Sequence, residues 1–277
     1  MRRERSYTFG LLTSEALGIA LAIIFLVPFY FLLVNSFKTL KEILLDAAKL
    51  PEQFGLDNFR RAWNAIDFPV VFMHSFTITV LSVAGLVVIS SMAAYRFVRR
   101  PTLFNRMLFS AFIAAMIIPF QSVMLPLMRI TSLFELRGHL YGIVVCYFGF
   151  GISLSMFLYH GFIKSVPREV EEAAVVDGCS PYGVFWRIVF PLLKPITATV
   201  IILNVLWIWN DYLLPVLVVN NTFTTIPIAI QKFFGQYTRK WDLAMAALTL
   251  SALPIIVFFF SLQKYIVEGI TAGSVKG

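Results

Sequence analysis

The sequence predicts an all-α integral membrane protein with six transmembrane helices. Hydrophobic residues make up 59% of its 277 residues and charged residues only 14%, whereas an average soluble domain is about half apolar and about a quarter charged. The mean hydropathy is +0.81. Because the apolar residues are gathered into long runs, we expect the chain to lie largely within a lipid bilayer.

Six segments are long and apolar enough to cross a membrane. A bilayer core of about 30 Å requires roughly 20 apolar residues in a helix, and a helix is expected because lipid cannot satisfy exposed backbone polar groups. We expect one transmembrane domain over residues 1–277. Its predicted spans are residues 13–36, 74–97, 105–128, 139–163, 195–219 and 243–265.

The distribution of basic residues predicts the orientation. Although the net charge is +8, the Lys and Arg residues flank apolar runs instead of forming a nucleic-acid-binding patch. Arg2, Arg3 and Arg5 precede the first run, which is too long for a signal-peptide core and lacks a small-residue cleavage site. The cluster Arg96–Arg106 contains no acid. We therefore expect the N- and C-termini to be cytoplasmic, and the segment 37–69 to form a short amphipathic helix at the outer surface.

The polar loop, residues 164–194, has the sequence signals of two short helices joined by a turn. Ser165 is a candidate N-cap and Pro167 suits a first helical turn. Gly178 is a natural left-handed stop. Ser180 and Pro181 then repeat the pattern of a cap followed by a proline. We expect this pair of helices on the cytoplasmic face.

The chemistry of the polar loop is suited to docking. Ala173 and Ala174 allow close approach of another protein, Glu172 supplies a charge, and Gly178 allows the bend. The alternative is an amphipathic loop that lies on anionic lipid. The loop's glutamates count against this alternative, because such helices are usually rich in Lys and Arg. Residue types alone leave both interpretations open.

The polar loop resembles the signature of binding-protein-dependent ABC import permeases, which has the form E-A-A, three residues, Gly, nine residues, I-x-x-P. Phe190 stands where leucine is usual. By this resemblance the loop is the coupling loop, on which an ATPase subunit docks. The residues it assigns to ATPase coupling are Glu172, Ala173, Ala174, Asp177, Gly178, Ile188 and Pro191.

The resemblance extends over nearly the whole chain, and the sequence most resembles the carbohydrate branch of that family. One departure is His74-Ser75, where Asn-Ser is common. The C-terminal stretch resembles the second, six-span permease subunit of sugar uptake systems. The similar stretches are Asn35-Ser36-Phe37-Lys38, Ala93-Ala94-Tyr95, Ile118-Pro119-Phe120-Gln121, Leu125-Pro126-Leu127, Trp209-Asn210-Asp211-Tyr212, Leu213-Leu214-Pro215 and residues 263–277.

The resemblance implies a type I ABC importer permease fold in a bacterial or archaeal cell membrane. It implies a second homologous permease, two ATPase subunits, an extracytoplasmic solute-binding protein and a sugar substrate as partners, and no nucleic acid. The chain has no G-x-x-x-x-G-K-[ST] loop. We therefore expect it not to be an enzyme, with ATP and Mg²⁺ bound by the partner ATPase. Its histidines show no metal-ligand spacing, so no metal is expected.

Polar and aromatic residues near the outer end of the fifth span are candidates for the substrate pathway. Asp211 is an acid within an apolar run, and intramembrane ionisable residues are candidates for function. Asn210 can bond a sugar hydroxyl, while Trp207 and Tyr212 can stack on a sugar face. The alternative is an aromatic belt with a structural cap. Gln121 can line the route or bond a neighbouring helix.

Other functions remain as alternatives. A permease of the same importer class for a glycerol phosphodiester or a polyol is compatible with the sequence. A solitary carrier or channel would lack a docking loop. A membrane-embedded enzyme would need a catalytic constellation at lipid depth, such as paired aspartates, and the sequence has none.

Overall fold

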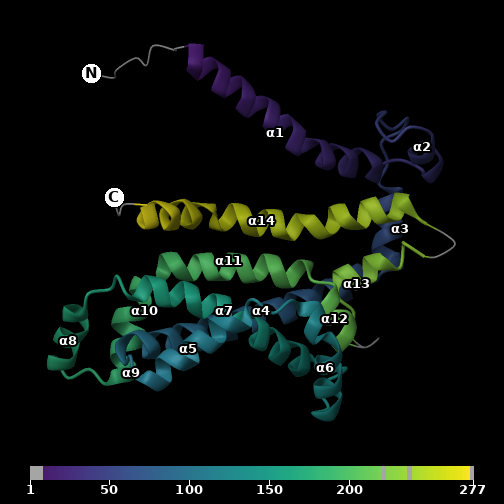
Figure 1. Ribbon diagram of the computed structural model, residues 1–277. Helices are drawn as coiled ribbons and strands as arrows, with labels where there is room; N and C mark the ends of the chain where they lie inside the picture. Colours follow the sequence, from purple (N-terminus) through teal and green to yellow (C-terminus); the bar gives the residue numbers. More distant parts are fainter. Residues whose placement is uncertain (1–8, 220–222, 236–238, 275–277) are drawn as a thin grey trace. The chain divides into compact units, whose positions relative to one another are not determined.

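All regular structure that the computed structural model describes, over residues 9–219, 223–235 and 239–274, is helical (Figure 1). Arg2, Arg3 and Arg5 lie outside these residues, as do residues 220–222, 236–238 and 275–277, and side chains beyond residue 263 are not described. The helices are α1 (Phe9–Ser36), α2 (Leu40–Leu45), α3 (Asp57–Ala65), α4 (Phe68–Arg99), α5 (Leu103–Ala115), α6 (Phe120–Leu133), α7 (Leu140–Ile163), α8 (Arg168–Val176), α9 (Pro181–Gly183), the π-helix η1 (Val184–Val189), α10 (Phe190–Leu192), α11 (Lys194–Asn210), α12 (Leu213–Val218), α13 (Ile226–Gln231) and α14 (Trp241–Ser274).

Four helices, α1, α4, α7 and α14, are each long and apolar enough to cross a membrane. Two bent pairs reach that length together, so that the described residues hold up to six candidate spans if each pair counts as one. The predicted segment 74–97 falls within α4, and the segment 139–163 corresponds to α7 with its N-cap His139.

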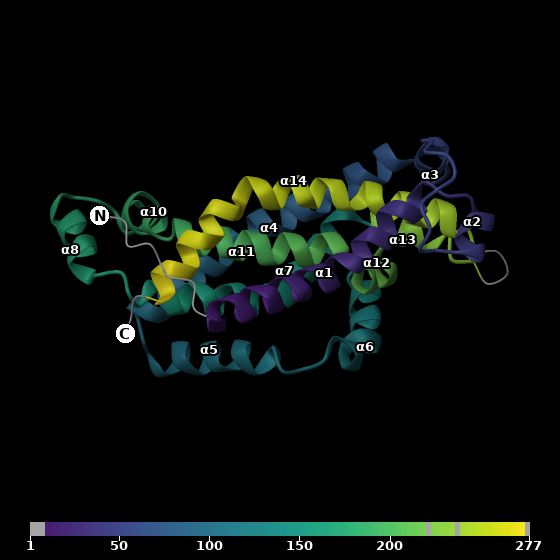
Figure 2. The ribbon, with the colours of Figure 1, turned by 90° about the horizontal axis from the view of Figure 1, so that it is seen from above.

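The predicted helices at 105–128 and 195–219 are interrupted. Helices α5 and α6 meet at 107° (Figure 2). The break ends at Pro119, the N-cap of α6, which has no N–H to continue the α5 ladder. The other bent pair is residues 181–192 with α11, at 78°, and α11 itself ends at Asn210, two residues before α12. Each of these two predicted segments therefore consists of two helices separated by a break.

The chain divides into two compact units, residues 1–68 with 230–253, and residues 69–229 with 254–277. In the first unit, the predicted amphipathic helix at 37–69 is instead two short helices, α2 and α3. Thr39 and Glu42 form a capping box that starts α2. The buried Lys38 ammonium donates to the carbonyls of Asp46 and Ala47 at 3.0 and 3.1 Å, which satisfies its charge with backbone oxygens.

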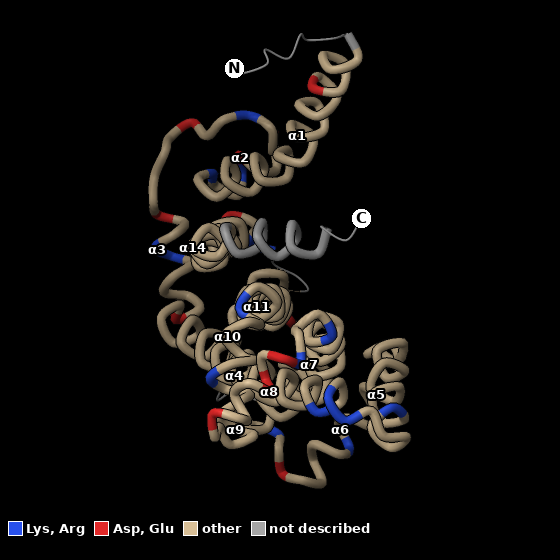
Figure 3. Tube along the Cα trace, turned by 90° about the vertical axis from the view of Figure 1, so that its left-hand side faces the viewer, with Lys and Arg blue, Asp and Glu red and all other residues tan. Residues whose placement is uncertain are grey.

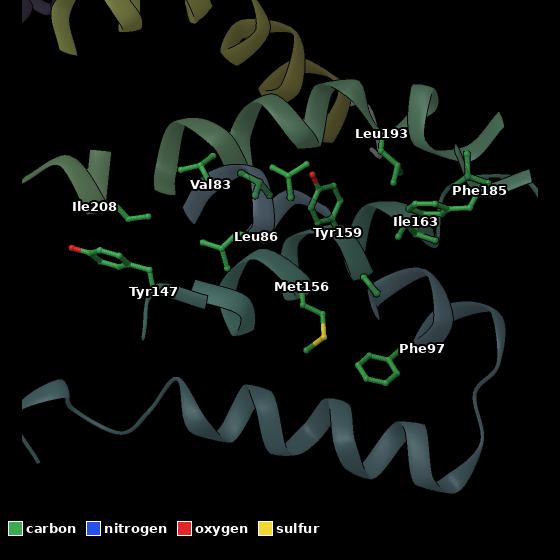
Figure 4. Close-up of a cluster of buried hydrophobic side chains, with 14 of the residues drawn as sticks. Val83, Leu86, Phe97, Tyr147, Met156, Tyr159, Ile163, Phe185, Leu193 and Ile208 are labelled. Atoms are coloured by element: carbon green, nitrogen blue, oxygen red, sulfur yellow. The ribbon is translucent and has the colours of Figure 1, made fainter. Parts of the chain in front are cut away.

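The core of the second unit lies between α4, α7 and α11. Leu86, Tyr147, Met156 and Tyr159 are fully buried there (Figure 4). Gly151 lets α7 approach its neighbours, because a Cβ at this position would lie 2.6 Å from Cδ1 of Leu86. Such small-residue contacts are typical of packed membrane helices. The result is one packed bundle with α8 at one end and α6 and α12 at the other (Figure 1).

Candidate functional site

The polar loop begins where α7 ends and contains α8, α9, η1 and α10. Its first start signal differs from the prediction: the Ser165 hydroxyl donates to the carbonyl of Phe162 instead of capping α8, and Pro167 is the N-cap residue rather than part of the first turn. The second signal is confirmed, because the Ser180 hydroxyl accepts from the Gly183 N–H at 3.2 Å. The expected single second helix, however, consists of α9, a π-helix and α10.

Gly178 ends α8 as the sequence predicts. Its φ is +82°, in the left-handed region. The Cys179 N–H donates to the Ala174 carbonyl and the Gly178 N–H to the Val175 carbonyl, both at 3.0 Å, which is the Schellman pattern of a helix C-terminus. This turn fixes the direction in which the chain leaves α8.

The buried face of α8 carries Ala174 and Glu171. Ala174 is buried among apolar residues of the core. Glu171, one turn earlier on the same face, is only 8% exposed. These two residues therefore anchor α8 to the bundle.

Glu171 is held by two side chains from the end of α4. The Arg99 Nε donates to its Oε1 at 2.7 Å, and an Arg99 terminal nitrogen lies 2.5 Å from the same oxygen. The Tyr95 hydroxyl donates to Oε2 at 2.8 Å. Arg99 also donates to the Val166 carbonyl at 2.9 Å. We call Glu171, Arg99 and Tyr95 the carboxylate clamp.

The opposite face of α8 is open. Glu172, Ala173, Val175 and Val176 are exposed, with Val176 at 87%. Figure 3 shows the acidic residues of α8 in red. The remaining residues of the predicted set divide in the same way: Asp177, the C-cap of α8, and Pro191 are exposed, whereas Ile188 in η1 is partly buried against the core.

Three of the five predicted pathway residues line one cavity. Gln121, Trp207 and Asp211 border a space of about 310 Å³ near the break between α5 and α6. Its other lining residues are Ala115, Met116, Ile118, Phe120, Phe150, Leu213 and Leu214. A mostly apolar wall with a few polar groups is the usual composition of a small-molecule site, and the volume is at the lower end of that range.

Asp211 also has a structural role. Its Oδ1 accepts from the Leu213 N–H at 3.0 Å, where α11 gives way to α12. Its Oδ2 accepts from the Tyr147 hydroxyl at 3.1 Å. Asn210 and Tyr212 do not line the cavity, and the Asn210 amide donates to the Leu206 carbonyl at 2.7 Å.

The clamp was missed by the prediction from sequence, although a signal existed. Glu171 and Ala174 are three residues apart and so share a helix face, whereas Glu172 lies on another. Placing the small Ala174 inward would have placed Glu171 inward as well. A buried carboxylate requires a basic partner, and Arg99 is such a residue. Across the described residues, no group of three or more His, Cys, Asp or Glu side chains is arranged to hold a metal ion.

The long apolar helices and the polar loop define a multi-span helical membrane protein with one elaborated surface loop. The chain belongs to the family of binding-protein-dependent transport system inner membrane components, whose sequence profile matches residues 85–272. The matched region includes α7, the polar loop and α11. The protein is therefore a permease component of an inner-membrane transport system.

Curated relatives cover nearly all of the chain. A probable starch degradation products transport system permease protein, AmyC of Thermoanaerobacterium thermosulfurigenes, is 43% identical over 94% of this chain and 95% of its own. The melibiose/raffinose/stachyose import permease protein MelC of Bacillus subtilis is 36% identical over 100% of both chains. The multiple sugar-binding transport system permease protein MsmG of Streptococcus mutans is 34% identical over 92% of this chain and 93% of its own.

A solved structure has the same fold. It is a chain from the crystal structure of a bacterial ABC transporter involved in the import of the acidic polysaccharide alginate. The TM-score is 0.80 at 19% sequence identity, covering 94% of this chain and 99% of the other. The likeness extends to both compact units of the chain and establishes the fold.

Proposed function

We propose that the chain is a membrane-spanning subunit of an ATP-driven, binding-protein-dependent importer of a sugar or oligosaccharide. The observation that carries this proposal is the full-length similarity to AmyC, MelC and MsmG, whose names all refer to carbohydrate transport. In this proposal a second homologous permease completes the pathway, two ATPase subunits hydrolyse ATP, and an extracytoplasmic solute-binding protein delivers the sugar.

The proposal includes an arrangement of the chain in the membrane. The chain forms one transmembrane domain with six crossings, in which each bent helix pair counts as one, and both termini are cytoplasmic. The acid-free cluster Arg96–Arg106, which runs from the end of α4 into the start of α5, supports this orientation. It puts the polar loop in the cytoplasm as well, because an even number of crossings separates it from the N-terminus.

The polar loop is the coupling loop that receives the ATPase. The open face of α8 combines the exposed apolar residues Val175 and Val176 with the charge of Glu172. Exposed apolar side chains beside a charge are typical of a protein contact surface. The Schellman turn at Gly178 holds this face in a fixed direction, so that a moving partner can displace the whole loop.

The cavity lined by Gln121, Trp207 and Asp211 is proposed as a part of the substrate pathway. An amide, a carboxylate and an indole ring are groups that bind sugar hydroxyls and sugar faces. Asn210 and Tyr212 belong to the proposed pathway only through their position next to Asp211. A glycerol phosphodiester or polyol remains the second candidate substrate class, although the carboxylate of Asp211 disfavours an anionic phosphodiester.

The first experiment is purification of the tagged chain from its native membranes in mild detergent, with mass spectrometry of the retained proteins. We expect a second permease, an ATPase and a solute-binding protein. The ligand that copurifies with the binding protein would give the substrate. Recovery of the chain alone from a gentle preparation would contradict the proposal and favour a solitary carrier.

The docking face is tested by Glu172→Lys, with Glu169→Lys as the matched control. Both residues are exposed acids on α8. We expect Glu172→Lys to lose about tenfold in ATPase copurification or in sugar-stimulated hydrolysis, because a desolvated pair at an interface is worth at least about 1.4 kcal/mol. Intact stimulated ATPase activity in Glu172→Lys would refute this role of Glu172.

The pathway is tested by Asp211→Asn, which retains an acceptor for the Leu213 N–H but removes the charge. We expect slower sugar uptake with unchanged amounts of folded protein. Tyr147→Phe is the control, because it deletes the hydrogen bond and leaves the carboxylate. Normal uptake by Asp211→Asn and Asp211→Ala would leave Asp211 with its structural role only.

A further inference from the structure

The carboxylate clamp joins two segments that the chain itself does not connect directly. Helix α8 follows α7 and leads to α11, so its movement reaches those helices through the backbone. Helix α4, in contrast, is distant in sequence: its residue Arg99 lies 72 residues before Glu171. Its link to α8 is made by side chains, through the clamp and through the contact of the Tyr95 and Phe185 rings at 5.1 Å.

The clamp is a stiff connection. Arg99 contacts one carboxylate oxygen through two nitrogens and Tyr95 occupies the other oxygen. The Arg99 and Glu171 side chains are only 13% and 11% exposed, so that water competes little for the pair. Charge-assisted hydrogen bonds of this kind are roughly twice as strong as neutral ones. Beside the clamp, a cavity of about 340 Å³ is lined by α4 residues and by Pro181, Tyr182 and Phe185, so the clamp and the contact of the Tyr95 and Phe185 rings lie at the edge of an open space.

The far end of α4 is bonded to a different segment. The Ser75 hydroxyl accepts from the Ile226 N–H at 2.9 Å in a buried position. The His74 Nδ1 lies 3.2 Å from the Thr224 carbonyl, and its ring lies 5.0 Å from that of Phe223. Segment 223–226 leads into α13, which begins at Ile226. Residues 75 and 99 are about 36 Å apart along the helix, at a rise of about 1.5 Å per residue.

We propose that α4 is a rod that carries movement of α8 to the segment 223–226 at the opposite end of the bundle. Glu171 and Arg99 are positioning residues at one end of the rod, and Ser75 is a positioning residue at the other. Helix α4 is a single helix of 32 residues, whereas α5 and α6 are separated by a bend of 107°, and residues 181–192 and α11 by a bend of 78°. The proposal rests on the proposed function, because it supplies the route by which ATPase movement opens the far side of the pathway.

The first test uses the purified chain in lipid nanodiscs, without partners, and measures amide hydrogen exchange. Glu171→Gln should raise exchange of the α8 amides about tenfold, because a charge-assisted contact is lost. Glu169→Gln, an exposed acid on the same helix, should leave that exchange unchanged. Equal exchange in the two variants would overturn the clamp. This measurement needs no ATPase, so its result is independent of the proposed function.

The second test measures sugar transported per ATP hydrolysed in proteoliposomes that contain the whole transporter. Glu171→Gln and Ser75→Ala should retain the ATPase but transport several-fold less sugar per ATP. Exchanging the charges in Arg99→Glu/Glu171→Arg should recover coupling relative to each single change. Arg96→Gln and Glu169→Gln are matched controls. Normal coupling in Glu171→Gln, or an exchange variant no better than its parents, would overturn the rod.

A third outcome separates the two proposals. If the wild-type chain retains no ATPase, the proposed function fails whatever the clamp does in nanodiscs. If Glu171→Gln alone loses the ATPase while Glu169→Gln retains it, Glu171 belongs to the docking surface and the rod is overturned.

Discussion

At the scale of single residues, the two adjacent glutamates at the centre of α8 have different surroundings. Glu171 points inward to the carboxylate clamp, whereas its neighbour Glu172 is exposed. Successive helical residues are about 100° apart, so one acid can anchor the helix while the next remains open to a partner. The E-A-A motif begins at Glu172 and does not include Glu171. The role of Glu171 becomes visible only through its contacts with Tyr95 and Arg99 of α4.

Replacement of Gly178 should weaken the end of α8. Its φ of +82° costs an L-residue about 1–2 kcal/mol, and asparagine tolerates this region better than alanine. We expect hydrogen exchange at residues 174–179 to increase in the order wild type, Gly178→Asn, Gly178→Ala. Gly161→Ala is the control, because a Cβ there has nothing within 4 Å and should not accelerate exchange. An inverted order would contradict the strain at residue 178.

At the scale of elements, close packing between α4 and α7 depends on glycine. A Cβ at Gly151 would lie 2.6 Å from Leu86 Cδ1 and 3.2 Å from the Asn204 amide oxygen. The amide nitrogen of Asn204 donates to the Ser155 hydroxyl at 2.9 Å. The absence of a side chain at Gly151 therefore also leaves room for a polar contact between α7 and α11. Membrane helices use both devices, and each interhelical hydrogen bond contributes about 0.6 kcal/mol.

Gly151→Ala should destabilise the bundle by about 1–3 kcal/mol, the usual cost of overfilling a packed site. Gly149→Ala, two residues away on α7, meets nothing within 4 Å and should be neutral. Thermal unfolding in one detergent at equal protein concentration would compare them. If both variants unfold at the temperature of the wild type, the contact between α4 and α7 is looser than described.

The short helix α2 should be sensitive to acid. Backbone and side-chain hydrogen bonds from Thr39, then from the Glu52 N–H, hold the pKa of Glu42 below its usual value of 4.5. A lowered folded-state pKa contributes stability above pH 4.5, and this contribution is lost as the pH falls through the folded-state value. The protection of α2 amides, measured relative to the intrinsic exchange rate at each pH, should therefore fall below about pH 4.5 in the wild type and stay constant in Glu42→Gln. Parallel pH profiles would contradict the capping role.

At the scale of the whole molecule, the orientation can be tested by labelling. In a chain that lacks Cys146 and Cys179, expressed without its ATPase, we place one cysteine at Gln53 or at Ser165, which are both exposed. A membrane-impermeant maleimide should label Gln53→Cys in intact spheroplasts and Ser165→Cys only after permeabilisation. The reverse pattern would invert the proposed topology, and equal labelling would contradict a transmembrane separation of the two sites.

Hydropathy and helix-capping residues report local structure, so the sequence predicts local features of the fold better than contacts between distant residues. Helices at 74–97 and 139–163 and the glycine stop of α8 agree with the prediction, because apolar length and a left-handed turn are local properties. The breaks at Met116–Pro119 and Asp211 do not follow from apolar length, because an apolar run looks the same whether its helix is continuous or bent. The clamp requires residues 72 positions apart to meet, and the cavity that joins Gln121 to Trp207 depends on the same tertiary packing.

The π-helix η1 gives the polar loop a property that none of the other described helices has: spare length. A π-helix holds more residues in each turn than an α-helix, so residues 184–189 can rewind as an α-helix with all residues retained. The rewinding would turn everything beyond it by about 100° relative to α8, one residue's share of a turn. The loop therefore contains a place where winding, rather than bending, can change the angle at which the chain enters α11, and where a deletion in a related sequence would be absorbed.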